Sequence, residues 1–117
     1  MSGIELRVRD YLEHARLAIE RIQRYTVDMD QASFLRNEMA QDAVIRNIEI
    51  IGEAANNIMK CDPGFARKHD EIPWAVIYAM RNRVSHAYHK VDEEIVWKTI
   101  QVDLPNLYRQ IVALLQG

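Results

Sequence analysis

Apolar side chains recur every three or four residues along almost the whole chain, and this spacing limits the fold more than any other feature. From Ile4 the apolar stripe continues to about Tyr25 and predicts a long amphipathic helix. No segment alternates with period two over the length of a strand, and no internal repeat of about 20 to 50 residues is present. The spacing therefore predicts an all-α protein.

Turn and capping residues divide the rest of the stripe into further helices. Asp30 can cap a second helix, which can break near residues 36–38 and ends at the Pro- and Gly-containing segment 61–64. A loop with a short polar helical turn is expected after it.

Two more helices complete the predicted architecture. Pro73 occupies the expected first position of a third helix, and Asp92 opens a fourth. Pro105 interrupts the fourth pattern, so the last helix should kink or split near it. We expect an up-and-down bundle of four to five helices.

Length and composition indicate one soluble domain, residues 1–117, in the cytoplasm. The chain has 117 residues, 49% of them hydrophobic, yet lacks both an export signal and an apolar stretch of the roughly 20 residues that a membrane crossing needs. Cys61 is the single cysteine, so neither an internal disulfide nor a thiolate metal pair is expected. The net charge of −2 excludes a generally basic nucleic-acid coat, although 11 of the 15 basic residues are Arg.

The segment from Met80 to Lys90 carries the candidate chemistry. At about 100° per residue, one helix face collects six polar side chains, opposite a packed face: Arg81, Asn82, Ser85, His86, Tyr88 and His89. A guanidinium can stabilise a phosphate that gains charge, and His moves protons near neutral pH. Together they can cleave RNA through the ribose 2′-hydroxyl. The absence of carboxylates between Glu71 and Asp92 argues against a two-metal phosphodiesterase and favours a mechanism without metal.

Plainer interpretations of this segment stay open. A helix face with Arg and His is often only solvated. His86 and His89 could share a metal, but no third ligand is evident. A hydrolase using Ser85 would lack an orienting acid and a Gly-rich elbow.

Other noteworthy side chains have structural explanations. We expect core or interface packing for Trp74 and Trp97, and structural or exposed positions for His14 and His69. On the second helix, Glu53 belongs to a polar face whose default role is solvation.

Glu53 also has a more specific hypothesis. It could instead anchor Arg81 across the bundle, because a fixed guanidinium is the better catalyst.

Several blocks resemble one known family. The similarity extends from about Arg7 to Leu115 and rests on these blocks: Ile51-Gly52-Glu53-Ala54-Ala55, Ile72-Pro73-Trp74, Met80-Arg81-Asn82, His86-Ala87-Tyr88, Val96-Trp97 and Asp103-Leu104-Pro105. The chain is similar to the HepT-like branch of the HEPN superfamily. The core motif of that family is Arg, a polar residue, three more positions, His, one position and Tyr. Arg81, Asn82, His86 and Tyr88 match it.

The resemblance implies a homodimer and a reaction. In such a dimer the Arg and His pairs of two subunits meet in one cleft and act as an endoribonuclease without metal or other cofactor. Carried over by position, Arg81 binds the scissile phosphate, His86 acts as base or acid, and Asn82 orients the site. Independently of the resemblance, Glu53 and Ser85 are expected to support the site because of their places on the polar helix faces.

The resemblance also implies a partner. The chain would be the toxin of a toxin-antitoxin system, and a minimal nucleotidyltransferase antitoxin would silence it by attaching AMP to Tyr88. Two other classes of function stay open: a non-catalytic module that binds a nucleotide or docks a nucleotidyltransferase, and a plain structural dimer.

Overall fold

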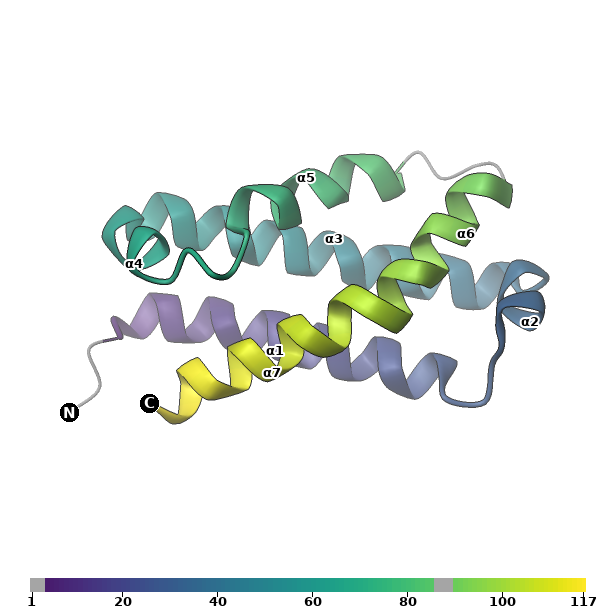
Figure 1. Ribbon diagram of the computed structural model, residues 1–117, viewed down its shortest axis with the longest axis horizontal. Coiled ribbons are helices and arrows are strands. Elements are labelled where there is room, and N and C mark those ends of the chain that lie inside the picture. Colours follow the sequence, from purple (N-terminus) through teal and green to yellow (C-terminus); the bar gives the residue numbers. More distant parts are fainter. Residues whose placement is uncertain (1–3, 86–89) are drawn as a thin grey trace.

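The computed structural model describes residues 4–85 and 90–117, and the regular structure in these ranges is helical throughout (Figure 1). This confirms the all-α prediction. In chain order the elements are α1 (Leu6–Thr26), α2 (Gln31–Leu35), α3 (Glu38–Cys61), α4 (Pro63–Lys68), α5 (Trp74–Ser85), α6 (Lys90–Lys98), the π-helical turn η1 (Thr99–Asp103) and α7 (Leu104–Gln116).

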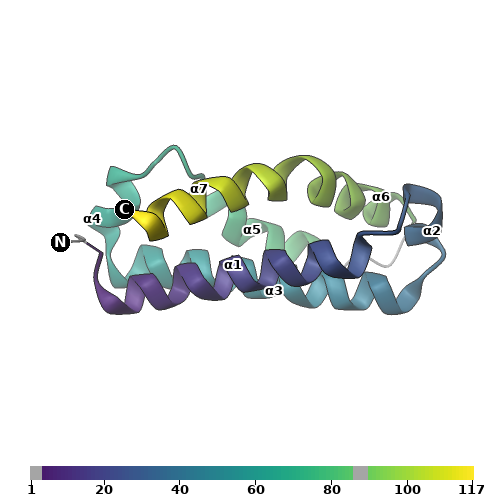
Figure 2. The same ribbon diagram turned by 90° about the horizontal axis from the view of Figure 1, so that it is seen from below.

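The long helices alternate in direction along the bundle. α3 lies between α1 and α5, and the α6–η1–α7 segment crosses one side of these three helices (Figure 1). Figure 2 shows α6 and α7 on the side opposite to α1 and α3. None of the helices in the described ranges has the length and apolar character that a membrane crossing requires.

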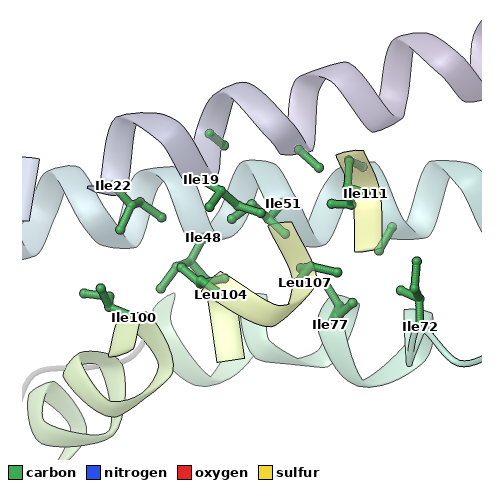
Figure 3. Packing of buried hydrophobic residues seen from close by; sticks show 14 of the residues in the cluster. Ile19, Ile22, Ile48, Ile51, Ile72, Ile77, Ile100, Leu104, Leu107 and Ile111 are labelled. Atoms are coloured by element: carbon green, nitrogen blue, oxygen red, sulfur yellow. The ribbon is translucent and has the colours of Figure 1, made fainter. Parts of the chain in front are cut away.

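Isoleucine and leucine side chains from α1, α3, α5 and α7 fill the space between the helices (Figure 3). They come from the periodic positions of the sequence, and each of the following is at most 7% exposed: Ile19, Ile22, Ile48, Ile51, Ile77, Leu104, Leu107 and Ile111. Full burial of each such side chain contributes about 1.5–3 kcal/mol. The α1 and α3 stripes therefore serve a common core.

Both tryptophans are buried, as expected from the sequence. The Trp74 Nε1–H group donates to the carbonyl oxygens of Ala66 (3.2 Å) and His69 (3.1 Å), so the start of α5 is tied to α4. The Trp97 ring packs against Phe34, with ring centroids 5.2 Å apart, and joins α6 to α2.

A hydrogen-bond cluster joins α7 to α1. The Tyr108 hydroxyl donates to Glu20 Oε2 at 2.7 Å, and Arg16 bonds the same oxygen at 2.7 Å. The hydrogen bond from Tyr108, aided by the charge of Arg16, lowers the pKa of Glu20. This cluster fixes the rotation of α7 about its axis.

Three element boundaries refine the sequence prediction. The second predicted helix breaks at residues 36–37, as anticipated, and the Asn37 side chain caps α3 by accepting from the Ala40 N–H group. Pro73 was expected as the first residue of the third helix, but α5 begins at Trp74. Pro73 precedes the helix and its carbonyl accepts from Ile77 N–H at 2.9 Å. The fourth helix begins at Lys90, before the expected Asp92.

The predicted interruption near Pro105 takes the form of a wide turn. Between α6 and α7, the Leu104 N–H group donates to the Thr99 carbonyl five residues earlier, which is the π-helical pattern. Pro105 stands in the first turn of α7, where its missing N–H is tolerated. The helical backbone therefore continues from α6 into α7, and only its hydrogen-bonding pattern changes just before the proline.

Candidate functional site

The candidate site begins at a close contact between α3 and α5. Gly52 of α3 faces α5, and a Cβ atom added to it would lie 3.0 Å from Arg81 Cβ and 3.4 Å from the Ile77 carbonyl oxygen. The first separation is tighter than ordinary van der Waals contact and the second lies at its lower limit, so a side chain at this position would require α5 to shift by a few tenths of an ångström. Gly52 therefore lets the backbone of α5, and Arg81 with it, lie against α3.

Arg81 reaches the residue that follows this glycine. Its Nε atom lies 2.8 Å from Glu53 Oε1, which is the contact anticipated from the sequence. The Arg81 side chain is 39% exposed and the Glu53 side chain 47% exposed. A pair this exposed adds at most about 1 kcal/mol to stability. The pair also restricts the orientation of the guanidinium, because it ties Nε to a residue of the neighbouring helix.

The other predicted site residues have different standing in the structure. Asn82 follows Arg81 on α5 and is exposed. The described residues do not include the Ser85 side chain, His86, Tyr88 or His89, although α5 ends at Ser85. The structure thus brings Arg81 and Glu53 together with Asn82 as the next residue along α5.

The two described histidines are placed as the sequence suggested. His14 is exposed on α1, and its ring meets Tyr11 edge-on with centroids 6.2 Å apart. The ring of His69 packs on Phe65, with centroids 4.6 Å apart, and its Nδ1 lies 3.5 Å from Glu71 Oε2. Both have contacts that account for them without chemistry.

Metal-ligating side chains do not converge in the described part of the chain. Within residues 4–85 and 90–117, no group of three or more His, Cys, Asp or Glu side chains could hold a metal ion. Cys61 instead donates its thiol to Glu5 Oε2 at 3.0 Å, which raises the pKa of Cys61.

The role of Gly52 was not predicted from the sequence. Its signal was a glycine inside a strongly periodic helix, a position where glycine costs about 1 kcal/mol relative to alanine and so indicates a close approach. Gly52 directly precedes Glu53, so the same turn of α3 supplies both the space for α5 and the partner of Arg81.

The sequence is similar to proteins of a known family. Residues 15–114 match the family model described as "Ribonuclease HepT-like". The chain is 44% identical over 99 residues to the "Probable ribonuclease HepT" of Thermococcus cleftensis, covering 85% of this chain and 87% of the relative. It is 35% identical over 112 residues to a "Putative RNase" of Caldanaerobacter subterraneus, covering 92% and 94% of the two chains.

A further relative is longer. The chain is 37% identical over 109 residues to the "Gamma-glutamylcyclotransferase and putative RNase" of Methanocaldococcus jannaschii, covering 93% of this chain and 48% of the relative. This chain therefore corresponds to about half of that protein. No solved structure gave a significant match.

Proposed function

The chain belongs to the ribonuclease HepT-like family, and from this membership we propose that it is an endoribonuclease and the toxin of a toxin-antitoxin pair. The observation that carries the proposal is the Arg81–Glu53 pair, at 2.8 Å. It holds a guanidinium on a helix surface five residues before His86 in the sequence. This arrangement suits a phosphate whose negative charge increases during reaction.

The proposed reaction needs one base, one acid and one stabilising cation. His86 removes the proton of a ribose 2′-hydroxyl, and the 2′-oxygen attacks the adjacent phosphorus. The bond from phosphorus to the 5′-oxygen breaks, and the leaving oxygen takes a proton from a second imidazole. The products are a 2′,3′-cyclic phosphate and a free 5′-hydroxyl. Arg81 stabilises the crowded phosphate, and Asn82 and Ser85 orient it.

A homodimer supplies the two imidazoles. Each chain contributes one His86, so a two-fold arrangement with the two Arg81 side chains in one cleft provides both base and acid. Glu53 is a positioning residue in this scheme, because it touches Arg81 rather than the RNA. No metal or other cofactor takes part in the proposed cut.

The proposed control of the toxin acts on Tyr88. A partner nucleotidyltransferase antitoxin would transfer AMP to the Tyr88 hydroxyl, with release of pyrophosphate from ATP. The added phosphate would pair with Arg81 and exclude RNA from the cleft.

A cleavage assay in excess chelator tests the proposal. Purified chain of unmodified mass is incubated with total RNA, and the product ends are mapped for cyclic phosphate. We expect Arg81→Ala to slow cleavage by about 10²- to 10³-fold and His86→Ala by about 10²- to 10⁴-fold. Arg83→Ala is the matched control, because Arg83 is exposed on the same helix.

Two results would contradict the proposed function. One is full cleavage by both the Arg81 and the His86 variants. The other is the absence of cleavage by unmodified protein across RNA classes, which would favour a nucleotide-binding or docking module.

A further inference from the structure

A second surface of mixed polar and apolar character lies at the end of the bundle where α1 ends and α3 begins. Here the end of α1 and the first turns of α3 line an open hollow of about 560 Å³. We call it the Tyr25 hollow, and its lining includes Tyr25, Met29, Met39, Ala43, Arg46 and Asn47. Figure 2 shows α1 and α3 side by side along this surface. Its volume falls within the range of about 300–1,000 Å³ typical of small-molecule sites.

The walls of the hollow are apolar and unusually accessible. Tyr25 is 42% exposed and Met39 is 82% exposed, although side chains of this size are usually covered in a core. Ala43 contributes a small side chain and leaves the surface beside Tyr25 concave. An exposed aromatic ring next to a concave apolar surface suits the flat face of a planar ligand.

The one charged side chain among the described residues that line the hollow is basic. This lining contains Arg46 and no acidic side chain. The guanidinium carbon of Arg24 lies 5.9 Å from the centre of the Tyr25 ring. Arg21 stands beside the hollow, because its Nη1 donates to Asn47 Oδ1 at 3.0 Å. Within the described ranges Arg46 forms no salt bridge, so its guanidinium can bind an external anion, whereas the charge of Arg24 also acts on Glu20 and helps to lower the pKa of that carboxyl.

The polar group beneath these side chains is already satisfied. Asn47 is 5% exposed, and its amide nitrogen donates to the Ala43 carbonyl at 2.8 Å while its oxygen accepts from Arg21. A ligand would therefore gain stacking and charge contacts here, while Asn47 would add little recognition of the hydrogen-bonding groups of a base. Stacking with backbone charge contacts is how single-stranded nucleic acids bind without strong sequence preference.

The position of the hollow relates it to the candidate site. Arg46 and Glu53 are seven residues apart on α3, which is two turns, so they share one side of the helix and are about 10 Å apart along its axis. Glu53 contacts Arg81, so one short strand can reach both places.

We propose that the Tyr25 hollow binds one base of single-stranded RNA near the cleavage site, with Tyr25 as the stacking surface and Arg46 as a phosphate contact. This inference deepens the proposed function and rests on it for the identity of the bound polymer. The hollow would position the strand and would explain how a chain of net charge −2 retains RNA.

Binding is best measured with a probe that cannot be cut. A fluorescent 2′-O-methyl oligonucleotide lacks the attacking hydroxyl, so its anisotropy with the full chain reports affinity without cleavage. We expect Tyr25→Ala to weaken binding by about 5- to 150-fold, the usual cost of losing one stacked base. Tyr25→Phe should bind nearly as well as the unchanged protein, because the ring face is kept.

The charge contact has a separate signature. Arg46→Gln should reduce the slope of log affinity against log salt by about 0.7, the value for one single-strand phosphate contact. Arg109→Gln is the matched control, since Arg109 is exposed on α7, on the other side of the bundle. A set of oligonucleotides carries one abasic site at successive positions. When the abasic position occupies the hollow, Tyr25→Ala should no longer change the affinity, because no base is left to stack.

Three outcomes would overturn the inference. The first is unchanged affinity in Tyr25→Ala together with an unchanged salt slope in Arg46→Gln. The second is an equal effect of Tyr25→Ala on a probe with no bases. The third is a change of molecular mass in these variants by light scattering with RNA affinity intact, which would make the surface a protein interface.

The test also separates this inference from the proposed function. A chain that binds the probe through Tyr25 but cuts no RNA would refute the function and leave the hollow as a binding site. A chain that cuts RNA and is indifferent to Tyr25→Ala would refute the hollow alone.

Discussion

Replacing Gly52 by alanine tests the close contact between α3 and α5. The added Cβ would lie 3.0 Å from Arg81 Cβ and 3.4 Å from the Ile77 carbonyl oxygen, and both belong to α5 near its backbone. Neither atom is the free end of a flexible side chain, so relief requires α5 to shift away from α3. The same shift would move Arg81 relative to Glu53.

The magnitude follows from two opposing effects. Alanine is better than glycine inside a helix by about 0.8–1 kcal/mol, whereas inserting a methyl group into a packed contact costs about 1–3 kcal/mol. Gly64→Ala is the matched control, because an added Cβ there meets only Asp62 Oδ1 at 3.4 Å. Both glycines have negative φ, so backbone strain does not distinguish them. We expect the two variants to differ in unfolding free energy by about 1–3 kcal/mol, with Gly52→Ala less stable.

Thermal unfolding followed by circular dichroism, at one fixed protein concentration, measures this difference. The unfolding entropy of about 2.1 cal/mol/K per residue, for 117 residues, converts 1 kcal/mol into about 4 °C of Tm. The melting temperature of Gly52→Ala should therefore lie about 4–12 °C below that of Gly64→Ala. Equal stabilisation by both alanines would refute the close approach of α3 and α5.

Three further changes probe separate contacts. Trp74→Phe should lower the unfolding free energy by about 1–3 kcal/mol, because two carbonyls lose the indole N–H; an unchanged urea midpoint would contradict this. Glu20 has a lower pKa in the folded chain than in the unfolded chain, so it stabilises the fold at pH values above its unfolded pKa. This contribution is lost as the pH falls through the folded pKa. Tyr108→Phe should therefore lose less stability than the unchanged protein between about pH 7 and pH 3 in urea titrations, and an identical loss would argue against the hydrogen bond. Glu53→Gln should lower the unfolding free energy by less than about 1 kcal/mol, because the pair of Glu53 with Arg81 is exposed. It should nevertheless slow RNA cleavage measurably. A large drop in melting temperature with full cleavage would show that Glu53 serves stability rather than the positioning of Arg81.

Much of the fold could be predicted because local patterns and global packing agree. The stripe from Ile4 to Tyr25 became α1 within two residues at the start and one at the end, since each apolar position faces the same core. Asn37 marks the break before α3 because a side-chain cap acts within three residues.

The parts that sequence missed depend on atoms far apart in the chain. The apolar spacing from Trp97 to Ile111 is that of an unbroken α-helix, so η1 left no trace in the pattern, although Pro105 indicated an interruption. The Arg81–Glu53 contact could be anticipated from opposite charges on facing helices. The Tyr25 hollow could not, because it needs the relative rotation of α1 and α3 to bring Tyr25 beside Arg46.

The wide turn before Pro105 has a consequence for how chains of this fold can change in length. In a regular α-helix the proline ring would strike the carbonyl of Gln101 four residues earlier, and the π-helical turn removes that clash by holding one more residue than an α-turn. Loss of a residue from η1 alone would restore the clash, whereas its loss together with the proline would give a continuous helix with α7 still in place. Homologous chains that are one residue shorter in this turn are therefore expected to lack the proline as well.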